Sequence, residues 1–85
     1  MIFWLLVEPM KEFLIQIVQA LVDNPEEIQV NAIEGSQTTV LELRVAKEDM
    51  GRIIGKQGKT ANAIRVLLNG ASGKAGKRHV LEIVE

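Results

Sequence analysis

The most informative stretch of this chain is RIIGKQGKT, Arg52–Thr60. It combines an apolar pair, two glycines three positions apart and three cations. Glycine suits a tight turn because it adopts backbone conformations that other residues avoid, but a turn has no need of surrounding positive charge. The stretch therefore predicts a turn that meets a negatively charged partner.

An amphipathic helix is expected well before this turn. Apolar residues recur at three- and four-residue intervals from Met10 to Leu21, and Asp23-Asn24-Pro25 ends the pattern. The apolar run at the start of the sequence has no basic leader and is shorter than the roughly 20 residues that span a bilayer. We therefore interpret residues 1–9 as an N-terminal appendage to one domain over residues 10–85, with no membrane association.

Two strands follow this helix. Apolar and polar residues alternate from Ile28 to Ala32, and Glu34–Gln37 has the composition of a hairpin turn. The returning strand is expected over Thr39–Val45, with an inward face made of Leu41, Leu43 and Val45.

The glycine turn itself joins two helices. The first is expected over Lys47–Ile54, and the apolar residues Ala63, Ile64, Leu67 and Leu68 mark the second. Asn69–Lys77, with three glycines and two lysines, predicts a mobile basic loop, so the second of these helices should end between Gly70 and Gly73. A last strand over Val80–Val84 completes the order α-β-β-α-α-β.

The charges are divided along the chain. Residues 1–43 hold one cation and seven acids, a net charge of −6, whereas residues 44–85 hold nine cations and four acids, a net charge of +5. Between Arg52 and Arg78 there are seven cations and no acid. This basic region indicates a polyanion partner or, alternatively, a solvated basic face.

Catalysis and metal binding find little support in the sequence. There is no cysteine, and the single histidine, His79, is expected to be solvated or packed at a strand edge. No nucleophile comes with a recognisable base, so we expect neither an enzyme nor a cofactor or metal site. A P-loop is excluded as well, because Ile53 stands where that motif requires glycine.

Nucleic acid is the remaining class of partner. The only aromatic residues, Phe3, Trp4 and Phe13, precede the first strand, so the strands offer no stacking platform for bases. A G-x-x-G turn instead offers backbone N–H groups and a helix N-terminus to phosphate, while Ile53 and Ile54 offer an apolar floor to bases. The expected RNA-binding residues are Arg52, Ile53, Ile54, Gly55, Lys56, Gln57, Gly58, Lys59, Lys74, Lys77 and Arg78.

With IIGKQGKTANAI at its centre, the chain from about Met10 to Glu85 resembles a KH domain of type II, the helix-first order. LVDNPEEIQV, LELRVAKEDMGRIIGKQGKTANAIR and GKRHVLEIVE are similar to the small bacterial single-KH proteins of the KhpA (YlqC) family. The resemblance implies an α+β fold with a three-stranded sheet covered by three helices. It also implies a cytoplasmic RNA chaperone that grips about four nucleotides of single-stranded RNA at GKQG.

The same resemblance implies a homodimer, a complex with a larger Jag-like KH protein (KhpB), or both, and a role in cell shape. Many KH domains have a bulky aliphatic residue where this chain has Ala61, which predicts a wider or shallower groove. The alternative hypothesis is a KH-like protein-interaction module without direct RNA binding.

Overall fold

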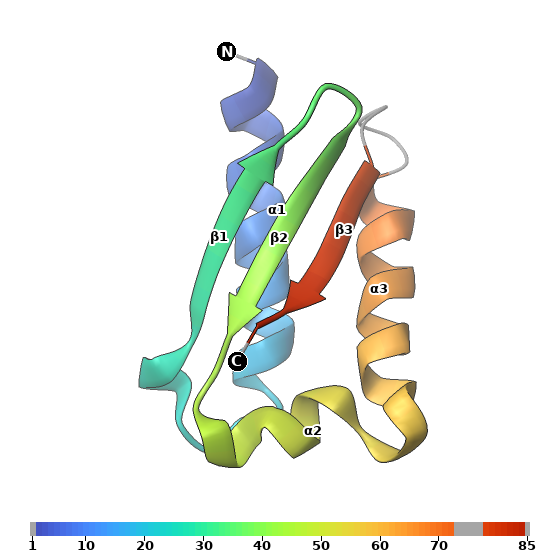
Figure 1. The fold of residues 1–85 in the computed structure, drawn as a ribbon. Coiled ribbons are helices and arrows are strands. Elements are labelled where there is room, and N and C mark those ends of the chain that lie inside the picture. The colour runs from blue at the N-terminus through green and yellow to red at the C-terminus, as the bar shows by residue number, and fades with distance from the viewer. Residues whose placement is uncertain (1, 73–77, 85) are drawn as a thin grey trace.

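The computed structural model describes residues 2–72 and 78–84, and its elements follow the expected α-β-β-α-α-β order (Figure 1). Three short 3₁₀ turns lie between the main helices and strands. In chain order the elements are α1 (Ile2–Gln19), η1 (Pro25–Glu27), β1 (Gln29–Glu34), β2 (Thr38–Arg44), η2 (Lys47–Asp49), α2 (Met50–Ile54), η3 (Lys56–Gly58), α3 (Lys59–Ser72) and β3 (Arg78–Ile83).

The three strands form one mixed sheet with β2 at its centre. β1 pairs with β2 antiparallel, as expected for a hairpin, and β3 pairs with β2 in parallel. The parallel pairing follows from the connection, because α2 and α3 carry the chain back to the end of the sheet where β2 began. In Figure 1, α1 runs behind the sheet and α3 stands alongside β3.

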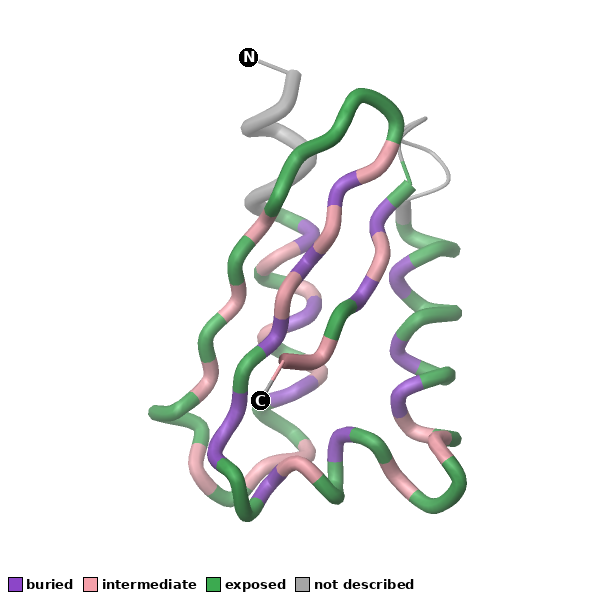
Figure 2. Tube along the Cα trace, viewed as in Figure 1, coloured by how far each residue is buried: buried purple, intermediate pink, exposed green. Residues whose placement is uncertain are grey.

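The core lies between this sheet and the helices (Figure 2). Leu41 and Leu43 are fully buried on the inward side of β2, as their alternation predicts. α1 contributes Met10, Leu14 and Val18 at four-residue spacing, which places them on one stripe of the helix. The remaining buried apolar members of this cluster are Val45, Ile53, Ile64, Leu68 and Leu81.

α1 and α2 differ from the expected boundaries. α1 begins at Ile2 and continues through Pro9, so most of the segment interpreted as an appendage is helical. The expected helix over Lys47–Ile54 is divided into η2 and the five-residue α2.

The apolar residues that mark α3 do not all lie on its buried face. Ala63 and Leu67 are exposed, and Ala61 is buried in their place beside Ile64 and Leu68. Asn69–Ser72, expected to begin the basic loop, belongs to α3, which ends within the expected interval. The remainder of that loop, residues 73–77, lies outside the described residues.

Candidate nucleic-acid interface

The turn between α2 and α3 is built from left-handed backbone conformations. Gly55 has φ 75°, Gln57 φ 58° and Gly58 φ 76°. Residues with a Cβ rarely adopt positive φ, whereas glycine adopts it readily, so the two glycines fit the positions that they occupy. Gln57 also has positive φ, although it carries a side chain.

Gly55 is also required by its contact with α3. A Cβ at this position would overlap Thr60 Oγ1 and would lie 2.8 Å from the Thr60 backbone nitrogen. The close approach lets Gly55 pack against the first turn of α3. The backbone amides of Gly55 and Gly58 are already engaged, because they donate to Gly51 O at 2.8 Å and Gly55 O at 3.1 Å.

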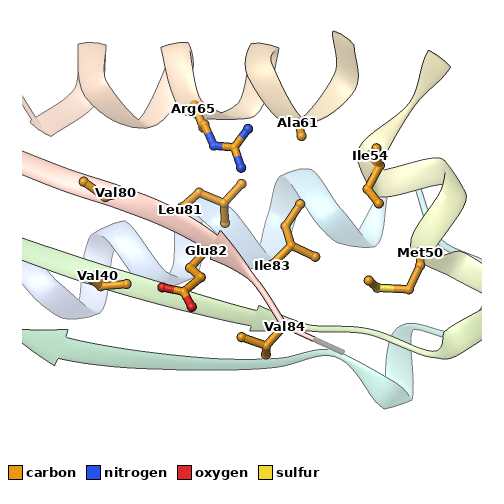
Figure 3. A pocket seen from close by; sticks show the side chains of 10 residues that line it. All are labelled: Val40, Met50, Ile54, Ala61, Arg65, Val80, Leu81, Glu82, Ile83 and Val84. Carbon is orange, nitrogen blue, oxygen red and sulfur yellow. The ribbon is translucent and has the colours of Figure 1, made fainter. Parts of the chain in front are cut away.

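An open cleft of about 680 Å³ lies between β3 and the pair of helices joined by this turn (Figure 3). Eight of the ten side chains that line it are apolar, and the two others are Arg65 and Glu82. The helices contribute Met50, Ile54, Ala61 and Arg65, and the strands and the residue after β3 contribute Val40, Val80, Leu81, Glu82, Ile83 and Val84. Such a cleft suits a flat apolar group with polar edges.

The structure brings only some of the expected RNA-binding residues to this cleft. Ile54 lines it, and Lys56, Gln57 and Lys59 are exposed on the turn that joins its helices and at the start of α3. Ile53, expected as part of the apolar floor, is fully buried in the core instead. Consecutive helical residues point about 100° apart, so the adjacent isoleucines face different surroundings.

The remaining expected residues lie elsewhere. Arg52 forms an ion pair with Asp23, with Nη2 3.1 Å from Oδ2, and is absent from the lining of the cleft. Arg78 is exposed at the start of β3. Lys74 and Lys77 lie outside the described residues.

Arg65 and Glu82 are the polar cleft residues that the sequence interpretation missed. Arg65 Nη1 donates to Asn62 Oδ1 at 3.3 Å, one helical turn earlier. Arg65 belongs to the basic region between Arg52 and Arg78. The charge of this region alone does not show on which face of α3 the Arg65 side chain lies. Glu82 reaches the cleft because β3 runs beside α3, a contact between segments that sequence periodicity cannot reveal.

A buried carboxylate connects the start of α2 to the segment between α1 and β1. Asp49 is 1% exposed and accepts hydrogen bonds from the backbone N–H of Asp23 at 3.1 Å and of Asn24 at 3.0 Å. Asn24 Nδ2 donates a third, also at 3.0 Å. Burial opposes ionisation, but these hydrogen bonds and the positive charge of Arg52 together hold the pKa of Asp49 below its ordinary value.

Other kinds of site find no support in residues 2–72 and 78–84. Within these ranges no helix is long and apolar enough to cross a membrane. The same part of the chain has no group of three or more His, Asp or Glu side chains placed to hold a metal ion. His79 is buried in β3, beside Thr39 of β2.

The helix-first order, the mixed three-stranded sheet and the G-x-x-G turn between α2 and α3 together define a KH domain of type II. A family model described as KhpA/KhpB, KH domain, matches residues 11–83. The chain belongs to this family.

Several relatives carry the name RNA-binding protein KhpA. The one from Clostridium acetobutylicum is 51% identical over 75 residues, which cover 88% of this chain and 100% of the relative. The one from Chlamydia pneumoniae is 49% identical over 76 residues, covering 89% and 97% of the two chains. The comparison with solved structures gave no match.

Proposed function

We propose that this protein binds single-stranded RNA along the cleft, with the RNA backbone at the GKQG turn. The observation that carries the proposal is the position of this turn, which joins the two helices whose side chains line the cleft. The name of the relatives, RNA-binding protein, supports the same function.

The turn provides a binding surface for phosphate. Lys56 and Lys59 are exposed on either side of Gly58, which has no Cβ to hold a phosphate away from the backbone. α3 also begins at Lys59, and the N-terminus of a helix favours negative charge. A surface of this extent can neutralise about two or three phosphates. This number fits a footprint of about four nucleotides.

The cleft provides the surface for bases. Ile54 and Ala61 offer apolar contact close to the turn, and Ala61 leaves more room than a bulky aliphatic residue would. At the polar edge, Arg65 can donate hydrogen bonds to base acceptors and Glu82 can accept them from base amino groups. Paired bases cannot enter in this way because their faces are stacked and their edges are occupied.

The finer parts of the proposal rest on the family resemblance. They are the RNA-chaperone activity, the homodimer, the complex with a Jag-like KH protein (KhpB), the cytoplasmic location and the role in cell shape. The contacts of Lys74, Lys77 and Arg78 with RNA also stay predictions.

Replacing Lys56 and Gln57 by aspartate together tests the RNA site. Both side chains are exposed between the turn glycines, and surface changes of this kind usually alter stability by about 0.5 kcal/mol or less. We expect the variant to stay folded and to lose binding of labelled single-stranded RNA, because two carboxylates would face the phosphates.

A variant with the same change of charge serves as the control. Gln16→Asp with Lys47→Asp alters two exposed residues that do not line the cleft, and it should retain most of the binding. If the doubly substituted turn remains folded and binds RNA as well as the parent, the cleft is not the RNA site. That result would favour the protein-interaction module.

A further inference from the structure

Arg52 lies on the side of α2 that points away from the cleft. Met50 and Ile54, two positions before and after it, both line the cleft, whereas Arg52 does not. A helix turns by about 100° per residue, so Arg52 projects from roughly the opposite side to these two residues. There its guanidinium meets the segment between α1 and β1.

The contact with this segment is made through Asp23. Arg52 Nη1 donates to Asp23 Oδ1 at 3.3 Å, and Nη2 lies 3.1 Å from Oδ2, so both carboxylate oxygens are engaged. The two side chains are 58% and 67% exposed, which makes this a surface ion pair. The paired geometry restricts the guanidinium more than a single contact would.

Asp49 holds the backbone of Asp23, the ion-pair partner of Arg52. Its buried carboxylate accepts hydrogen bonds from the backbone N–H groups of Asp23 and Asn24, 3.1 and 3.0 Å away. Although Asp49 stands at the N-cap of α2, its side chain makes no cap hydrogen bond to its own helix. The carboxylate of Asp49 and the guanidinium of Arg52 therefore attach α2 to the same short segment.

We propose that Arg52 is a positioning residue for the GKQG turn, acting through Asp23, and that it does not contact RNA. This inference rests on the proposed RNA-binding function. α2 has only five residues and is too short to be stable without tertiary contacts. Because α2 leads directly into Gly55, the contacts that fix its direction also fix where the turn presents Lys56 and Lys59.

The fully buried Ile53 fixes one side of α2 in the core, and Arg52 fixes an exposed side. If Arg52 instead bound a phosphate, it would have to leave Asp23 or hold both anions at once. The basic charge of Arg52 would then add to the salt dependence of RNA binding, whereas a positioning role would not.

Arg52→Gln separates these roles through the salt dependence of RNA affinity. We expect affinity for a labelled single-stranded RNA to fall about twofold to fivefold, the range that the loss of an exposed ion pair allows. The slope of log affinity against log salt should stay unchanged. A slope less steep by about 0.7 would reveal a lost phosphate contact and overturn the inference. Unchanged affinity at a temperature where the variant is folded would also overturn it.

Exchanging the two charges gives an independent test. Asp23→Arg alone places two cations together, and Arg52→Asp alone places two acids together, so each should weaken RNA binding. The double variant restores an ion pair and should bind within about twofold of the parent. If it binds as weakly as Arg52→Asp alone, the ion pair with Asp23 does not position the turn, and the inference is overturned.

Glu26→Arg is the matched control for Asp23→Arg. Glu26 is exposed in the same segment and the change of charge is identical, but it has no part in the attachment of α2. It should leave RNA binding unchanged or slightly stronger, while Asp23→Arg weakens it. The charge exchange can fail to restore RNA binding while aspartates at positions 56 and 57 still abolish it. That combination would reject the positioning role of Arg52 and would leave the proposed RNA site in place.

Discussion

Gly55 and Gly58 share a left-handed backbone, with φ of 75° and 76°, yet a side chain would meet very different surroundings at the two positions. At Gly58 nothing lies within 4 Å of the place where a Cβ would stand, whereas at Gly55 the first turn of α3 occupies it. Conformation alone therefore requires glycine at position 58, and conformation and packing together require it at position 55.

Alanine substitutions at these two positions should differ in cost. Gly58→Ala should lower the free energy of unfolding by about 1 kcal/mol, the penalty of the left-handed backbone less the gain from a stiffer unfolded chain. Gly55→Ala should lower it by a further 1–3 kcal/mol or so, because the Thr60 side chain and backbone must move. Urea unfolding of both variants gives the comparison, and equal losses would show that the contact with Thr60 has little energetic weight.

Asp49 should make stability depend on pH. Because its pKa is lower in the folded protein than in the unfolded chain, the unfolded chain takes up the proton first as the pH falls. Its contribution is therefore complete above the unfolded-state pKa of about 4 and is lost as the pH falls through the folded-state value.

Thermal melts of the parent and Asp49→Asn from pH 7 to pH 3 measure this contribution. The variant should have the lower Tm at neutral pH, since an amide cannot replace the carboxylate oxygens at all three donors. The difference between the two Tm values should narrow below about pH 4. A difference that stays constant over this range would show that folding does not lower the pKa of Asp49.

Among the elements, local patterns predict β1, β2 and β3 well. Alternation along the first two strands, the turn residues between them and the apolar run of the last strand are all local properties. The buried face of α3 does not follow from the local pattern. Ala61 and Ala63 are both small and apolar, and Leu67 and Leu68 are adjacent, so two neighbouring stripes fit the same helical period. Only the position of α3 beside β3 selects the stripe with Ala61, Ile64 and Leu68.

Long-range contacts also explain why α2 differs from expectation. The pattern over Lys47–Ile54 fits a single helix, but the side chain of Asp49 hydrogen-bonds Asp23 and Asn24 instead of serving the start of that helix. A contact across 26 positions leaves no mark on local periodicity.

Removing residues 1–9 tests the role of the first half of α1. Met10, Leu14 and Val18, which are buried in the core, all remain in the shortened chain. We therefore expect residues 10–85 to fold cooperatively and to bind RNA, with a lower Tm because a shorter helix frays more readily. An unfolded product would show that the segment is an integral part of the domain.

Sedimentation of the same shortened protein tests assembly. The sequence MIFWLLV is strongly apolar, and apolar segments of this kind commonly attract a partner. We expect the full chain to form a dimer and the shortened chain to be monomeric. If both chains sediment as dimers, this segment does not hold the dimer together.

Over the whole molecule, the net charge of −1 does not reveal that the acidic and basic residues are concentrated in different halves of the chain. The sequence predicts the G-x-x-G turn and its lysines because all of these residues are neighbours along the chain. The cleft combines residues of α2 and α3 with Val40 and with residues at and beyond β3, so its membership depends on the fold. This is why Ile53, expected in the floor, is buried and does not line the cleft, and why Glu82, which lines it, is absent from the expected site.

A cleft with so few charged residues should bind RNA weakly and with a shallow dependence on salt. Neutralising two or three phosphates of a single strand predicts a slope of log affinity against log salt of about −1.5 to −2. Duplex RNA should compete poorly, since its bases cannot lie against Ile54 and Ala61. Titrations at several salt concentrations, with single-stranded and duplex RNA of the same sequence as competitors, measure both properties. A much steeper slope, or equal competition by the duplex, would indicate that RNA lies across a wider basic surface and not in the cleft.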